Sequence, residues 1–192
     1  MKLQVLIISI LFSLLSGPIY GQETDTATVS KTTEEKLTPQ QKLKDGVLLV
    51  RLRTQKNKIK ALQDAGRSEE AQDVINTQKI ENDLIMAAFD QTYTYSKVYF
   101  FYSTEGQKIL DKQWDGVLMN AQQMPVEVSS DQYFLIAAFG ESDGRKIDGL
   151  IIYDQEAHQM KRPFPYLTRR KHFFNILSRS HGDMIKLFQE SL

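Results

Sequence analysis

The side chains that could support metal or nucleophilic chemistry are few. The chain has three histidines, His158, His172 and His181, and none lies in an HExxH pattern or another spacing typical of zinc ligands. No serine lies in a G-x-S-x-G elbow, and the glycines form neither a Walker loop nor a G-x-G-x-x-G fingerprint. The chain has no cysteine, which excludes disulfides, thiol catalysis and thiolate metal sites. We therefore assign no catalytic residue and expect neither a metal nor a cofactor.

The most distinctive chemical feature is a basic tract near the C-terminal end. Residues 158–192 contain seven basic and two acidic residues, a local charge of +5, although the whole chain has 24 residues of each sign. Aromatic residues such as Phe164 and Tyr166 interleave with the basic ones, and the two kinds together hold anions through charge and stacking. The predicted anion-binding or partner-binding residues are Lys161, Arg162, Arg169, Arg170 and Lys171. A structural interpretation stays open, in which the aromatics pack and the basic residues neutralise acidic helices.

Two other kinds of site also stay open. An enzyme could assemble its site from scattered residues near 147–162, with these four as candidates: Asp148, Asp154, His158 and Arg162. A small-ligand carrier could line an apolar pocket with Tyr93, Tyr99 and Tyr133, although core packing is the preferred explanation of these tyrosines. The balanced net charge argues against nucleic acid as a partner. We expect an envelope protein or an anionic polymer instead.

The first 21 residues have the pattern of a signal peptide. Lys2 precedes an apolar stretch at residues 3–15, and a helix-breaking Ser-Gly-Pro follows before the small residue Gly21. We predict cleavage before Gln22, which makes the protein periplasmic or secreted, although an uncleaved anchor is the alternative. Residues 22–37 are polar and are expected to form a flexible leader. No later stretch reaches the roughly 20 apolar residues needed to span a bilayer.

Residues 38–90 are predicted to form an antiparallel helical hairpin. Thr38, Pro39 and Gln41 form a helix start with a capping box, and leucines and isoleucines then recur at helical spacing as far as residue 62. Gly66 is placed to end this first helix, and Ser68 to begin a second one that runs to about residue 89. The short connection between the two helices favours an antiparallel pair.

Residues 91–192 are predicted to form an α/β domain that packs with the hairpin as one globular unit. Aromatic and β-branched enrichment indicates strands over 98–102, 133–139 and 150–153, with the last two as a β-hairpin and a further short strand at 117–119. Helices are expected over 103–110, 171–178 and 183–191. The expected fold class is α/β or α+β, in which an N-terminal antiparallel helical hairpin is followed by a small mixed sheet with flanking helices.

Three segments carry a resemblance to a known group of proteins. Residues 97–103 (KVYFFYS), 149–154 (GLIIYD) and 160–166 (MKRPFPY) resemble uncharacterised exported proteins of Bacteroidota, over about residues 90–170. The Tyr-Gly-Gln at 20–22 is similar to signal cleavage sites common in that group. This resemblance implies a periplasmic or secreted setting and carries no activity with it.

A weaker resemblance is architectural. An aromatic-rich strand, a helix, a β-hairpin and a terminal helix are similar to the thioredoxin fold, but no Cys-x-x-Cys follows Ser103. That resemblance implies a redox-inactive thioredoxin-like domain. We expect an exported, non-enzymatic binding or envelope-associated module.

Overall fold

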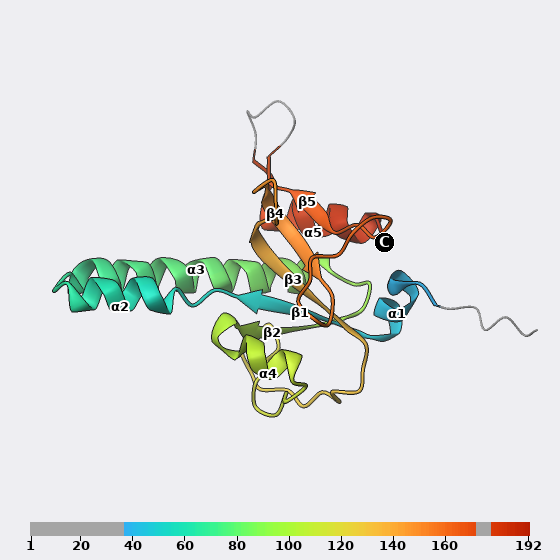
Figure 1. Ribbon diagram of the computed structural model, residues 1–192, viewed down its shortest axis with the longest axis horizontal. Helices are drawn as coiled ribbons and strands as arrows, with labels where there is room; N and C mark the ends of the chain where they lie inside the picture. Colours follow the sequence, from blue (N-terminus) through green and yellow to red (C-terminus); the bar gives the residue numbers. More distant parts are fainter. Residues whose placement is uncertain (1–36, 172–177) are drawn as a thin grey trace, which may run out of the picture. The chain divides into compact units, whose positions relative to one another are not determined.

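The computed structural model describes residues 37–171 and 178–192, which belong to one compact unit, Lys36–Leu192 (Figure 1). The predicted signal peptide, and the predicted leader as far as residue 36, lie outside the described residues. The elements are α1 (Pro39–Asp45), β1 (Val47–Leu52), α2 (Lys56–Asp64), α3 (Ser68–Thr92), β2 (Lys97–Tyr102), the 3-10 turn η1 (Ser103–Glu105), α4 (Gly106–Leu110), β3 (Phe134–Glu141), β4 (Asp148–Tyr153), β5 (Leu167–Arg169) and α5 (His181–Glu190).

The strands form one mixed sheet in the order β2-β1-β3-β4-β5. The interior strand β1 runs parallel to both neighbours, so that Val50 lies opposite Phe100 on one side and Ala137 on the other. The strands β3, β4 and β5 are joined antiparallel, with Ala137 opposite Ile152 and Leu150 opposite Thr168. This mixed sheet with helices confirms the expected α+β class and the β-hairpin formed by β3 and β4.

The predicted first helix is wrong in its middle. The capping box of Thr38 and Gln41 does begin a helix, but α1 ends at Asp45 and residues 47–52 form β1. The segment VLLVRL is a short apolar run, and such a run fits a buried strand as well as one turn-and-a-half of helix. Burial decides between the two, because every residue of β1 except Arg51 is enclosed by the two layers that cover the sheet.

The helical hairpin itself is present, formed by α2 and α3. Gly66 adopts a positive φ of 72° after α2, which is the left-handed conformation expected of a helix-ending glycine. The helix α2 has no buried residue, whereas α3 buries Asn82, Ile85, Met86 and Phe89 in its C-terminal half. The hairpin is therefore attached to the sheet through one end of α3.

Helices lie on both faces of the sheet (Figure 1), and two clusters of buried side chains pack against it, one on each face. On one face, α3 and α5 pack over alternate strand residues such as Leu48, Phe100 and Leu135, with Phe89 and Phe188 at the centre. On the other face, α4 and the segment after it supply Ile109, Trp114 and Leu118, which pack on residues of opposite parity. The product is a three-layer arrangement with its cores on both sides of β1.

The C-terminal part differs from expectation in three places. The strand β5 was not expected, because Pro163 and Pro165 suggested irregular chain, yet β5 begins immediately beyond them. Most of the helix expected over 171–178 lies outside the described residues, and its ends, Lys171 and Ser178, pair as an antiparallel bridge instead. The strand expected over 117–119 is reduced to isolated bridges of Met119. The last helix is present, and Ser180 and Asp183 form its capping box.

Candidate anion-binding site

The basic tract begins on an excursion of the chain between β4 and β5. The excursion begins with a turn at Asp154. The Asp154 Oδ1 accepts hydrogen bonds from the backbone N–H groups of Glu156, at 3.0 Å, and His158, at 2.8 Å. Met160 then donates its backbone N–H to Ile152 O at 2.9 Å. Phe164 is buried with its ring 6.3 Å from that of Phe188. The excursion is thus tied to the sheet near its start and to the core near its end, which fixes the residues between.

Two adjoining pockets lie along this excursion. The larger, about 800 Å³, is lined by Lys161 and Arg162 and by the turn at 154–160. The smaller, about 310 Å³, is lined by Arg162 and Arg169 together with the Pro-Phe-Pro segment. Arg162 and Tyr166 belong to both pockets. We call the side chains of Lys161, Arg162 and Arg169 the basic rim.

The positive charges of the basic rim are available to bind a ligand. Among the described residues, none of its three side chains forms an ion pair. Asp143 and Asp154 line the larger pocket, but Asp154 is already engaged by the backbone N–H groups of its own turn. Tyr166 adds an aromatic side chain to the lining of both pockets. Such a combination suits an anion that is both charged and able to pack on a ring.

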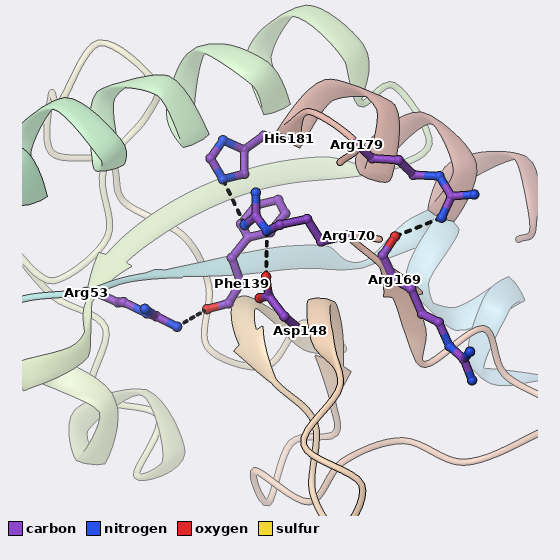
Figure 2. Close-up of polar contacts among 7 residues, drawn as sticks. All are labelled: Arg53, Phe139, Asp148, Arg169, Arg170, Arg179 and His181. Carbon is purple, nitrogen blue, oxygen red and sulfur yellow. Dashed lines mark hydrogen bonds and ion pairs between the residues drawn. The ribbon is translucent and has the colours of Figure 1, made fainter. Parts of the chain in front are cut away.

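Arg170 and Lys171 do not join the basic rim. Figure 2 shows the side chains of Arg169, the last residue of β5, and Arg170, in the bend that follows, pointing apart. Arg170 donates from Nε to Asp148 Oδ2 at 2.8 Å, so its charge is compensated. Lys171 is exposed at the end of the described segment and bridges Ser178 through the backbone. The five predicted residues therefore divide into three that gather and two that do not.

Arg170 instead belongs to a partly buried cluster under α5 (Figure 2). One of its terminal nitrogens lies 3.4 Å from His181 Nε2, and its guanidinium carbon lies 5.9 Å from the centre of the Phe139 ring. The rings of His181 and Phe139 meet edge to face at 4.5 Å. Burial, followed by repulsion from Arg170, lowers the pKa of His181 below its ordinary value of 6.5. His181 is therefore neutral at neutral pH.

The residues proposed for an enzyme are only partly brought together. Asp154, His158 and Arg162 line the larger pocket, whereas Asp148 lies at the far end of β4 with Arg170. His158 is 73% exposed, with its Nδ1 3.8 Å from Asp154 and 3.4 Å from Glu156. The Asp154 carboxylate organises a turn here, and the described residues place no nucleophile beside this histidine.

The tyrosines proposed for a ligand carrier do not share a pocket. Tyr93 is buried in the core under α3 and α5, and its hydroxyl lies 3.0 Å from Ser96 Oγ. Burial raises its pKa. Tyr99 packs against the core on the opposite face of the sheet, while Tyr133 packs on the same face as Tyr93. The sheet therefore separates Tyr99 from Tyr93 and Tyr133, and the three rings cannot line one pocket as the carrier alternative requires.

Comparison of the chain with family models, with curated proteins and with solved structures found no match. Within residues 37–171 and 178–192, no group of His, Asp or Glu side chains is arranged to hold a metal ion, and no helix is long and apolar enough to cross a membrane. Sequence reasoning missed Arg51 and Arg53, which lie at the end of β1 beside a small cavity. These arginines alternate with apolar residues, a pattern typical of a strand with one polar face. The pattern was overlooked because the segment was interpreted as a helix.

Proposed function

We propose that the protein is an exported, non-enzymatic binding module that holds an anionic polymer at the basic rim. The observation that carries the proposal is the convergence of Lys161, Arg162 and Arg169 on two adjoining pockets without ion-pair partners among the described residues. A polymer suits these pockets better than a small molecule, because the larger one is broad and the cations are spread along two of them.

Export remains part of this proposal and rests on the N-terminal sequence. The apolar stretch at residues 3–15 and the small residue Gly21 support cleavage before Gln22. Intact-mass measurement of the protein recovered from the envelope and culture fractions tests it. A mature N-terminus at Gln22 is expected, and full-length protein confined to the cytosol contradicts export while leaving polymer binding to be judged separately.

The binding experiment compares two triple variants of equal charge. The rim variant carries Lys161→Gln, Arg162→Gln and Arg169→Gln, and the control variant carries the same loss of charge at three exposed lysines away from the pockets: Lys44→Gln, Lys58→Gln and Lys97→Gln. Binding to heparin and to lipopolysaccharide is measured by calorimetry at several salt concentrations, because contacts to a polyanion weaken as salt rises.

The rim variant is expected to lose at least about tenfold in affinity and to show a shallower salt dependence, since three charge contacts disappear. The control variant is expected to bind like the parent. Equal weakening of both variants points to bulk charge and contradicts a defined site. Absence of binding by the parent protein to either polymer overturns the proposal, and an envelope protein then becomes the partner to seek.

A further inference from the structure

A crevice opens between β1 and β3 at their carboxyl ends. The two strands pair only as far as Val50 opposite Ala137. Beyond that point β1 stays with β2 as far as Leu52 opposite Tyr102, and β3 stays with β4 as far as Glu141 opposite Asp148. The strands therefore diverge, and a cavity of about 210 Å³ lies where they separate.

The crevice lies at the carboxyl ends of two parallel strands, beside the point between β1 and β2 where the chain changes the face on which it crosses the sheet. The connection from β1 to β2 places α3 on one face, and the connection from β2 to β3 places α4 on the other. In open α/β sheets, ligands bind in the crevice outside the carboxyl ends of strands at such a switch point. The basic rim lies elsewhere, on the excursion between β4 and β5 and at the end of β5.

Two arginines line the crevice, and both are held in place. The guanidinium carbon of Arg51 lies 5.5 Å from the centre of the Tyr153 ring, which gives it a cation–π contact. Arg53 donates from Nη2 to the backbone carbonyl of Phe139 at 2.9 Å. That carbonyl lies on the stretch of β3 that has parted from β1. Both side chains are fixed by contacts that leave their remaining N–H donors available.

The charge of the crevice is positive. No carboxylate forms an ion pair with Arg51 or Arg53 among the described residues. Glu141 contributes to the lining, but alternation along β3 places it with Phe139, whose ring faces the core under α3 and α5. Among the described residues that line the cavity, Arg51 and Arg53 are thus two cations against the single carboxylate of Glu141.

We propose that this crevice binds a small oxyanion, either free phosphate or the carboxylate of a compact organic acid, between the guanidinium groups of Arg51 and Arg53. Arginine presents paired N–H donors that match both anions. The cavity volume of about 210 Å³ limits the ligand to a single small group and excludes a nucleotide or a polymer.

The test is a titration of isotopically labelled protein with sodium phosphate and, in a separate arm, sodium acetate, at constant ionic strength. Saturable NMR shifts are expected at the Arg51 and Arg53 side-chain N–H signals and at the Gly140 amide. The anion that binds more tightly identifies the source of the oxyanion. Arg51→Gln with Arg53→Gln is expected to weaken binding by at least about tenfold. A control of equal charge, Arg145→Gln with Lys58→Gln, is expected to bind like the parent.

A second variant displaces one arginine without removing charge. A Cβ at Gly140 would lie 2.9 Å from Arg53 Nη2, the mobile end of a side chain, so Gly140→Ala moves Arg53 while the backbone stays. Weaker binding is expected there too. Heparin affinity is expected to be unchanged in both crevice variants, which separates this proposal from the one for the basic rim. The absence of saturable shifts, or undiminished affinity in the double arginine variant, overturns the proposal.

Discussion

Arg170 joins Asp148 twice, once through its Nε at 2.8 Å from Oδ2 and once through its backbone N–H at 3.0 Å from the Asp148 carbonyl. The two residues fasten the chain that follows β5 to the first residue of β4. The side chain of Arg170 also covers the Phe139 ring. Arg170 therefore stabilises the fold, whereas its neighbour Arg169 belongs to the proposed binding site.

Replacing Arg170 is expected to destabilise the protein by about 1 kcal/mol, since a partly exposed charge-assisted bond contributes about that much. Arg170→Met is the appropriate variant, because it keeps most of the packing on Phe139. Urea unfolding of this variant, of Asp148→Asn and of the double variant gives the coupling between the two side chains. Additive effects, with no coupling, would show that the ion pair contributes nothing.

Stability is expected to depend on the protonation of His181. Its pKa in the folded protein lies below the unfolded value of 6.5, because burial and Arg170 disfavour the charged ring. The stabilising contribution of the neutral ring is therefore complete above pH 6.5 and is lost as the pH falls through the folded pKa. The groups that face the ring are Arg170 and Phe139, with the more distant Glu81 and Asp148 favouring the proton.

The measurement is the free energy of unfolding from pH 7.5 to pH 5 for the parent and for His181→Gln, which keeps a hydrogen-bond acceptor but cannot be protonated. The parent is expected to lose more stability than the variant as the pH falls. An NMR titration of the ring gives the pKa directly, and a value at or above 6.5 would falsify the account.

Much of the sheet could be predicted from sequence because its strands are rich in β-branched and aromatic residues. The β-hairpin of β3 and β4 follows from that enrichment and from the turn between Glu141 and Lys146. The strand β1 could not be separated from a helix, because Leu48 and Leu52 satisfy helical spacing and strand alternation alike. Only the burial of both faces distinguishes them, and burial is a property of the assembled sheet.

The candidate site was predicted in composition but not in arrangement. Lys161, Arg162 and Arg169 do lie around adjoining pockets. Arg170 departs because it lies in the bend just beyond β5, where its side chain points away from that of Arg169 and contacts Asp148. The sequence offered no strand pattern beyond the two prolines. The local excess of positive charge therefore located the region. Which of its basic residues join the site and which pack on the core depends on β5, a strand that forms only through tertiary pairing.

The amide of Asn82 is expected to hold the end of β1. Asn82 is buried on α3 and donates from Nδ2 to the carbonyl of Arg53 at 2.9 Å. Asn82→Ala leaves that carbonyl without this partner, which costs about 1–3 kcal/mol in similar cases. Asn76→Ala, at an exposed position of the same helix, is the control and is expected to change stability by less than about 0.5 kcal/mol. Equal effects of the two variants on urea unfolding would show that the buried bond has no special role.

Gly149 is expected to be essential for attaching β5, and with it the basic rim. A Cβ at this position would lie 2.2 Å from the Thr168 backbone oxygen, which cannot move without breaking the β4–β5 pairing. Gly149→Ala should therefore cost about 1–3 kcal/mol, the range typical of overpacking, and should speed amide exchange over Leu167–Arg169 and weaken heparin binding. Gly106→Ala meets no atom within 4 Å at the start of α4 and is expected to be neutral or slightly stabilising. If Gly149→Ala is as stable as Gly106→Ala and exchanges no faster at β5, the close approach of the two strands is not what positions Arg169.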